Sequence, residues 1–247
     1  MTRSERYLPL ADIASTQWGM ITTAQARQVG ITSQQIARLA ANGVLERFHH
    51  GVYILNGVPR DRLTDLKAAW LALDVDTTAA DRLASDDPGA VVSHRSAARA
   101  HDLGDIDADI NEFTTTGPKR SRHKDIRLHR RTLDREDWTI IDGLPTTTVA
   151  TTLADLAAAH IDGGHLGAAL RDALVHGQIR TASAVTALRP YATDYDAPLG
   201  DGQTLIRSLL VQAGGLSRTL TAARSREFAW LAEQLDTAPD SLADHHG

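Results

Sequence analysis

The sequence predicts an α+β fold, with a small N-terminal domain of helices and one hairpin followed by a mixed α/β domain that ends in helices. Three observations support this prediction. Glycines divide the first 55 residues into three short helical stretches and two β-prone runs. Further β-prone runs lie between residues 91 and 141. Beyond residue 151, apolar residues recur at the spacing expected of packed helices.

The N-terminal helices are each bounded by residues that cap helices. A threonine or serine precedes the second and the third helix, and a glycine follows each of the three. These residue types satisfy or terminate the backbone groups that helix ends leave without partners. The predicted helices cover residues 10–18, 23–29 and 33–42.

A β-hairpin is predicted directly after the third helix. Residues 44–55 contain two β-prone runs on either side of His49-His50-Gly51, which has the composition of a turn. Helix, short helix, glycine-containing turn, helix and hairpin follow one another in the order of a winged helix-turn-helix. We therefore expect a winged helix-turn-helix domain over residues 1–57, with a linker around Pro59.

The second predicted domain covers residues 58–235. It begins with an amphipathic helix over residues 62–73, and a helix capped at Ser93 follows. Strands are expected within 110–116, 126–130 and 138–141. Later helices are expected at 151–159, 166–175, 181–188, 205–211 and 219–235. Residues 236–247 are expected to form a disordered tail.

Composition excludes several classes of protein. The chain has no cysteine among its 247 residues, so disulfides, zinc fingers and thiol nucleophiles are excluded. No apolar stretch approaches the roughly 20 residues that a membrane span needs, and the polar N-terminus leads into no signal peptide. We therefore expect a cytoplasmic protein without membrane contact.

The charge of the chain is unevenly distributed. The formal net charge is −5, yet residues 1–60 hold six arginines against three acidic residues. A second basic segment, residues 117–131, carries seven basic residues against Asp125. Two basic islands in an acidic chain indicate a localised site for a polyanion. Ordinary solvated surface is the alternative interpretation.

The third predicted helix carries the most specific signal for binding. Ile36, Leu39 and Ala40 share one apolar stripe, which is expected to pack toward the other helices. The opposite face presents residue types that read base edges in the major groove of DNA. Backbone amides near Thr32 and Ser33 could bind a phosphate. The candidate base-reading residues are Gln34, Gln35, Arg38 and Asn42. Any amphipathic helix with a solvated polar face offers the competing explanation.

The hairpin and the second basic segment supply further candidates. Arg47 and His49 lie at or near the tip of the expected wing, where an arginine reaches a phosphate or a narrow minor groove. Lys119, Arg120 and Arg122 begin the second basic segment. That segment has three open uses: additional contact with the DNA backbone, an acidic protein partner, or solubility.

The sequence contains no motif for catalysis or for cofactor binding. Its eleven histidines are scattered without the spacing of metal ligands, so no metal site is expected. Asp105, Asp107 and Asp109 alternate, but no following Glu-x-Lys completes a nuclease centre. We therefore expect a protein that is not an enzyme and that needs no cofactor.

Several segments resemble the AbiEi-type antitoxin and transcriptional regulator family of bacteria. The resemblance begins in Ile21-Thr22-Thr23-Ala24-Gln25-Ala26 and continues through ITSQQIARLAANGVLERFHHGVYIL, residues 31–55. Later segments resemble actinobacterial members, with Thr151 in a place where relatives often carry an arginine. These later segments are VVSHRSAARAHDL (91–103), IRLHRRTL (126–133) and DGLPTTTVATTLADLA (142–157).

The resemblance implies a repressor that is also an antitoxin. Its winged helix would bind operator repeats in the promoter of its own operon, on double-stranded DNA. The C-terminal part would neutralise a cognate toxin of nucleotidyltransferase type. The alternative is a stand-alone winged-helix transcription factor whose C-terminal domain senses a ligand or a protein. Both a monomer and a dimer are compatible with the sequence.

Overall fold

The computed structural model describes residues 7–118, 121 and 123–214, and it confirms the α+β class. The chain forms two compact units. The first comprises residues 1–92 and 109–146, and the second comprises residues 93–108 and 147–247. The predicted boundary at residue 57 lies inside the first unit, and independent folding of residues 1–57 stays a prediction. The predicted tail, residues 236–247, lies outside the described residues.

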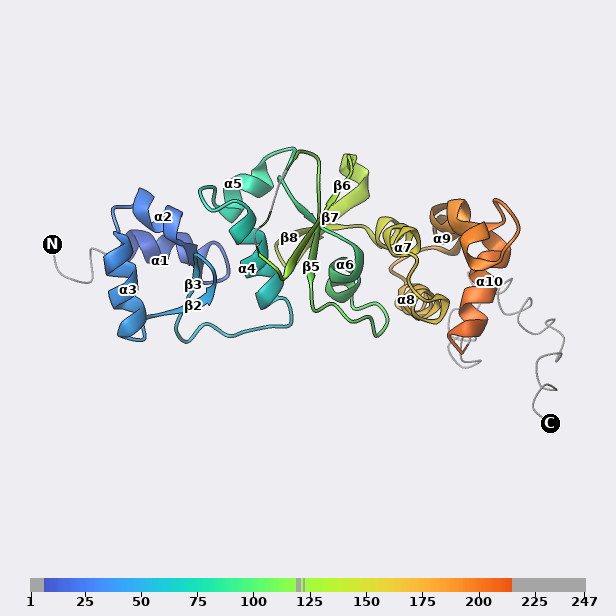
Figure 1. Cartoon of the computed structure of the whole chain (residues 1–247), viewed down its shortest axis with the longest axis horizontal. Helices are drawn as coiled ribbons and strands as arrows, with labels where there is room; N and C mark the ends of the chain where they lie inside the picture. Colours follow the sequence, from blue (N-terminus) through green and yellow to red (C-terminus); the bar gives the residue numbers. More distant parts are fainter. Residues whose placement is uncertain (1–6, 119–120, 122, 215–247) are drawn as a thin grey trace. The chain divides into compact units, whose positions relative to one another are not determined.

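The N-terminal part of the first unit consists of three helices and a small antiparallel sheet (Figure 1). Central β3 pairs with β1 on one side and with β2 on the other. The predicted helices and hairpin are present, whereas strand β1 had no counterpart in the sequence prediction. The elements are α1 (Leu8–Ser15), β1 (Met20–Thr22), α2 (Thr23–Gln28), α3 (Ser33–Ala41), β2 (Leu45–His49) and β3 (Val52–Leu55).

Capping boxes fix the starts of α2 and α3. Thr22 caps α2 and Thr32 caps α3, and in each case the glutamine three residues later bonds back to the cap residue. This arrangement satisfies two backbone donors at each helix start, so it sets where the helix begins. Ile36 and Leu39 of the predicted apolar stripe are buried, while Ala40 is half-buried. The core that they join contains Leu10, Ile21, Ala26, Ile31 and Leu45.

The rest of the first unit is built around a mixed five-stranded sheet in the order β6-β5-β4-β8-β7. Strand β5 runs antiparallel to β4 and parallel to β6, and β4 runs parallel to β8. Strand β8 lay outside the predicted β-prone runs. The elements are α4 (Thr64–Leu73), α5 (Ala79–Ala84), β4 (Val91–Val92), β5 (Asn111–Thr115), β6 (Ile126–Arg130), the 3-10 turn η2 (Arg135–Asp137), β7 (Trp138–Ile141) and β8 (Leu144–Thr147).

Helix α4 connects the two sheets of the first unit, since it packs against β1, β2 and β3 and also against β5 (Figure 1). Its Trp70 is fully buried and donates from Nε1 to the Ala90 carbonyl at 2.8 Å. The Arg82 guanidinium lies 3.3 Å from the centroid of the Trp70 ring and donates to the Trp70 carbonyl. Burial lowers the pKa of Arg82 to about 10, although the charge of Asp74 opposes this shift. Helix α4, anchored by these contacts, packs beneath the β2–β3 hairpin.

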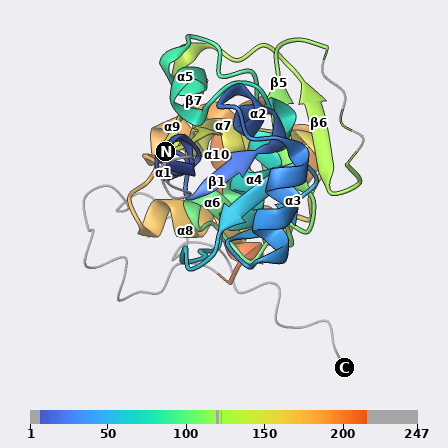
Figure 2. The same cartoon turned by 90° about the vertical axis from the view of Figure 1, so that its left-hand side faces the viewer.

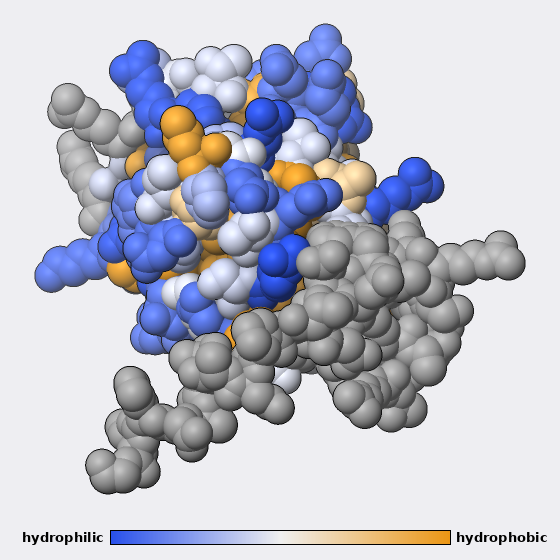
Figure 3. Space-filling view, turned by 90° about the vertical axis from the view of Figure 1, so that its right-hand side faces the viewer, coloured by the Kyte–Doolittle hydropathy of each residue, from blue (hydrophilic) through white to orange (hydrophobic). Residues whose placement is uncertain are grey.

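The second unit is helical, and leucine and alanine side chains fill its core. Helix α8 approaches α10 closely, since a Cβ atom at Gly167 would lie 2.1 Å from the Leu209 carbonyl oxygen. On the face seen in Figure 3, hydrophilic residues predominate and apolar ones are scattered between them. The elements are α6 (His94–His101), α7 (Val149–Ala158), α8 (Gly163–Val175), α9 (Thr181–Leu188), the 3-10 segment η3 (Arg189–Tyr195) and α10 (Gly202–Gln212).

The predicted helices of the second unit are present through α10. The helix expected at 219–235 lies outside the described residues. Among the helices of residues 7–118, 121 and 123–214, none combines the length and the apolarity needed to cross a lipid bilayer.

Candidate nucleic-acid interface

Helix α3 presents a polar face on the outside of the N-terminal part. Gln34, Arg38 and Asn42 are exposed, and Gln35 is half-exposed. The helix is prominent in Figure 2, where the N-terminal side faces the viewer. Because Ile36 and Leu39 hold the opposite face in the core, the orientation of the polar face is fixed. We refer to Gln34, Gln35, Arg38 and Asn42 as the recognition face.

Gln35 has a structural task within this face. Its Oε1 atom accepts from the Thr32 backbone amide at 2.8 Å and from the Thr32 hydroxyl at 3.0 Å. The Thr32 hydroxyl oxygen accepts in turn from the backbone N–H of Gln35. Pairing with adenine would use both polar atoms of the glutamine side chain, so it would compete with the cap. Gln34, Arg38 and Asn42 are therefore the stronger candidates for base contact.

Three arginines among the described N-terminal residues carry exposed positive charge. Arg27, Arg38 and Arg47 are exposed, and none of them forms an ion pair with an acidic side chain of the described residues. In contrast, Arg60 is paired with Glu46 and lies 5.1 Å from the centroid of the Phe48 ring. Within residues 7–60, the positive charge available to a polyanion thus lies on α2, α3 and the hairpin.

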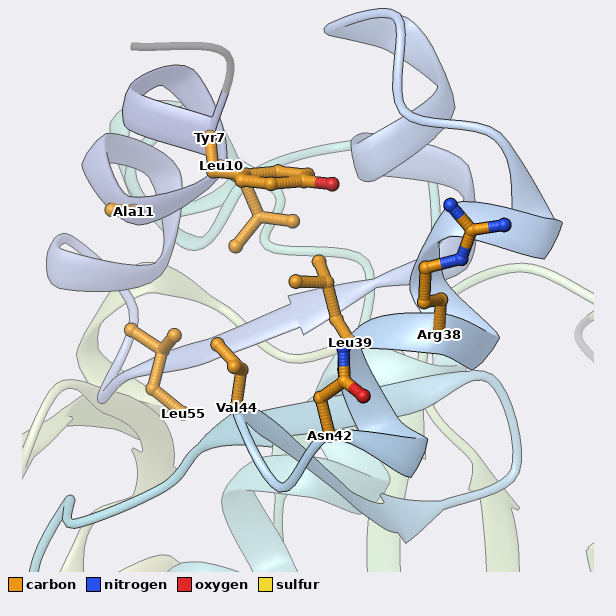
Figure 4. A pocket seen from close by; sticks show the side chains of 8 residues that line it. All are labelled: Tyr7, Leu10, Ala11, Arg38, Leu39, Asn42, Val44 and Leu55. Atoms are coloured by element: carbon orange, nitrogen blue, oxygen red, sulfur yellow. The ribbon is translucent and has the colours of Figure 1, made fainter. Parts of the chain in front are cut away.

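A recess of about 440 Å³ lies beside Arg38. Figure 4 shows apolar side chains from α1, α3 and the start and end of the hairpin lining it. The Arg38 guanidinium extends from α3 at its edge. Because the side chains that line it are mostly apolar, the recess offers few polar groups to a ligand. It lies at the base of the recognition face. Its residues are Tyr7, Leu10, Ala11, Arg38, Leu39, Asn42, Val44 and Leu55.

The β2–β3 hairpin contains an irregularity that redirects its side chains. Arg47 is opposite Tyr53 and His49 is opposite Val52, so the register shifts at Phe48. Such a bulge bends a strand and re-aims the neighbouring side chains. Arg47 stays exposed, and its Nη2 atom donates to Nδ1 of His50 at 2.9 Å.

His49 points toward the loop that precedes β6. Its Nε2 atom lies 3.0 Å from Oδ2 of Asp125, and its side chain is 13% exposed. The rings of His49 and His50 both contact the ring of His123. Burial, followed by the charge of His49, lowers the pKa of His123. The predicted DNA contact from His49 would require it to leave Asp125.

His123 and Asp125 of the second basic segment therefore contact the hairpin tip, although the two regions are far apart in the sequence. Sequence reasoning missed this contact because His49 and Asp125 carry no shared motif or spacing. The sites predicted at Lys119, Arg120 and Arg122 lie outside the described residues.

Two basic side chains of strand β6 are already paired. Arg127 Nη1 and His129 Nε2 lie 3.2 Å and 3.4 Å from the same Oε1 atom of Glu112. The Glu112 side chain is only 4% exposed, whereas that of Arg127 is 56% exposed. A buried carboxylate thus offsets part of the positive charge of this segment.

The alternating aspartates do not form a metal-holding group among the described residues. Asp105 and Asp107 instead line a pocket of about 510 Å³ in the second unit, which Arg95, Asp162 and His165 also line. Positive and negative side chains face the same space there, a composition that suits a small polar ligand.

Comparison with known protein families gives one match at the N-terminus. Residues 9–56 match the family described as "Transcriptional regulator, AbiEi antitoxin". The match covers the α1–β3 segment with its recognition face and hairpin, so the predicted resemblance is confirmed over these residues. For the later segments the resemblance stays a prediction. A comparison with curated proteins gave no match.

Proposed function

We propose that residues 1–57 form a winged helix-turn-helix that binds double-stranded DNA with sequence specificity. The observation that carries the proposal is the exposed recognition face of α3, flanked by arginines without acidic partners, inside the segment that matches the regulator family. In this arrangement α2 and α3 form the helix-turn-helix, and the β2–β3 hairpin is the wing.

In the proposed complex, α3 enters the major groove. Arg38 pairs with a guanine, and Gln34 or Asn42 pairs with an adenine, because these side chains present matching donors and acceptors. The backbone amides that follow Thr32 bind a phosphate at the start of the helix. Arg47 contacts a phosphate or the minor groove beside the wing.

The place of the second basic segment favours additional backbone contact over the other uses considered. Asp125 and His123 touch the wing through His49, so residues beside them stand near any duplex that the wing contacts. Lys124 and Arg127 would then add electrostatic attraction without reading sequence.

On the same basis we propose that the protein is an antitoxin that represses its own operon. The family description for residues 9–56 joins the two properties. The second unit would neutralise a cognate toxin of nucleotidyltransferase type. In this proposal the protein is cytoplasmic and is not an enzyme. It binds operator repeats as a monomer or a dimer.

A stand-alone transcription factor is the second candidate, and the polar pocket of the second unit favours it. A pocket of about 510 Å³ lined by charges of both signs suits a small-molecule signal. Co-expression with the product of the neighbouring gene discriminates the two. Rescue of growth supports the antitoxin, whereas a non-toxic neighbour and ligand-dependent release of DNA support the sensor.

Fluorescence anisotropy with DNA from the gene's own promoter tests the DNA-binding proposal. The full chain is expected to bind this DNA more tightly than a shuffled sequence at moderate salt. Arg38→Ala should remove most of that preference, while Arg180→Ala, an exposed arginine of the second unit, should leave it unchanged. Equal affinity of the folded protein for both DNAs would exclude sequence-specific binding.

A further inference from the structure

Three metal-ligating side chains converge where the hairpin tip meets the loop before β6. His49, His123 and Asp125 each offer one ligand atom, and these atoms all lie within 4.8 Å of one another. Within residues 7–118, 121 and 123–214, this is the one group of three or more such side chains. No spacing in the sequence indicates this group, because His49 ends strand β2 whereas His123 and Asp125 lie together in the loop before β6, more than 70 residues later.

The spacing of the cluster is close to that of a metal centre. Two ligand atoms about 2.1 Å from a tetrahedral zinc ion lie roughly 3.4 Å apart. His49 Nε2 and Asp125 Oδ2 are 3.0 Å apart, a hydrogen-bond distance that a slight widening would convert to this spacing. The rings of His49 and His123 have centroids 4.6 Å apart and are tilted by 51°. The ligand atom of His123 lies within 4.8 Å of the other two, so a small side-chain rotation would bring it to the spacing of a zinc site.

His49 is the fixed member of the cluster. Its side chain is only 13% exposed, and strand β2 holds its backbone. The Nδ1 atom of His49 is buried and has no hydrogen-bond partner among the described residues. An ion bound at Nε2 would leave the ring proton on Nδ1, where a water would satisfy this buried atom.

The chemistry of the donor set selects the class of metal. Two imidazoles and one carboxylate suit first-row transition ions, whereas magnesium and calcium prefer sites made of oxygen ligands. We infer that His49, His123 and Asp125 form a binding site for a divalent transition-metal ion, with zinc as the best fit. Water would complete the four-coordinate shell, as it does in zinc sites with three protein ligands.

A bound ion would join the wing to the second basic segment. It would tie β2 to the loop before β6 through bonds to both, and it would add positive charge beside Arg47 and Lys124. The ion would therefore strengthen binding to DNA without changing the base preference of α3. This consequence rests on the proposed function, whereas the metal site itself does not.

Zinc binding is measured directly on the full chain without an affinity tag. Metal-free protein competes with a chromophoric chelator for zinc, and cobalt serves as a spectroscopic probe of four-coordinate geometry. We expect one zinc ion per chain at this site, a rise in Tm with zinc, and no such rise with magnesium.

Variants assign the ion to its ligands. His49→Ala, His123→Ala and Asp125→Asn should each weaken zinc binding by at least about tenfold, since each removes a ligand. His50→Ala is the matched control, because His50 is the next residue on the hairpin and also contacts the His123 ring. His176→Ala controls for an exposed histidine of the second unit. Both control variants should bind zinc as the unchanged protein does.

The inference fails if the folded protein binds no zinc, or if the three ligand variants bind it as well as the unchanged protein does. An equal loss in His50→Ala would overturn the assignment to these three residues. Should His49→Ala fail to fold by circular dichroism, His123→Ala decides, because His123 lies in a loop. Zinc binding without an effect on DNA affinity would leave the site intact and remove its proposed consequence. Failure of DNA binding alone would not affect the zinc result.

Discussion

The two basic surfaces of the first unit differ in how their charge is held. On α3 and the hairpin, Arg38 and Arg47 are exposed and have no acidic partner among the described residues. In the second basic segment, Arg127 and His129 share the buried carboxylate of Glu112. The density of basic residues is greater in the second segment, yet among its described residues the charge of Arg127 is offset by Glu112. Charge counts along a sequence therefore overestimate a surface whose cations are paired inside the fold.

The largest expected effect on DNA binding comes from Arg38 on helix α3. Arg38→Ala should cost about 1–3 kcal/mol of binding free energy at one base position of the operator, because a bidentate contact to a guanine is lost. Affinities for the operator and for operator variants measure it. Equal losses on operator and random DNA would show that Arg38 contacts the backbone alone.

Arg47 and Arg127 test the comparison most directly, because each variant removes one exposed arginine. Arg47→Ala should weaken binding to all sequences alike and flatten the slope of log affinity against log salt by about one. Arg127→Ala should change the slope less, since Glu112 already pairs with that guanidinium at 3.2 Å. Salt titrations of both variants check this order. Equal changes in slope would mean that the ion pair with Glu112 does not reduce the contribution of Arg127 to DNA binding.

A Gln35→Ala variant tests whether Gln35 caps helix α3 or contacts a base. Gln35→Ala should lower the free energy of unfolding by no more than about 1 kcal/mol, because one half of the capping box is lost. Its effect on DNA affinity should be equal for operator and random sequences. Urea unfolding and anisotropy measure the two quantities. A change in base preference at one position would instead assign Gln35 to base contact.

The smallest expected effect on DNA binding comes from Glu112, the acidic partner of Arg127 and His129. Glu112→Gln should modestly raise affinity for random DNA and steepen the salt dependence, because Arg127 and His129 lose a negative partner. Affinity measured over a range of salt concentrations tests it, with Asp102→Asn, an exposed acidic residue of the second unit, as the control. An unchanged salt dependence in a folded Glu112→Gln protein would show that the β6 face lies away from DNA.

Local elements were largely predictable from the sequence. Strand β6 and helix α9 have the bounds that the sequence predicted, and α3 is capped by Thr32, one of the two residues expected at its cap. Hydrophobic periodicity and capping residues act within a few positions of the chain, so they are visible without the fold. Strand β1 was missed because it has only three residues, and β8 was missed because Pro145 weakens its β-strand signal.

The candidate site was predictable only in part. Exposure of Gln34, Arg38 and Asn42 follows from the helical period that buries Ile36 and Leu39. The cap formed by Gln35 was visible in principle, since a threonine three residues before a glutamine is the capping-box pattern. The contact of His49 with Asp125 was not, because it depends on a bulge and on a loop from another sheet.

The sequence by itself determined the α+β class, the order of the N-terminal elements, the polar face of α3 and the presence of two basic segments. These properties depend on residue type and short-range spacing. Only the tertiary structure decided that the second segment meets the hairpin tip, that Glu112 neutralises part of it, and that His49, His123 and Asp125 converge. The physical reason is that sheet order and loop placement bring together residues whose separation in the chain carries no periodic signal.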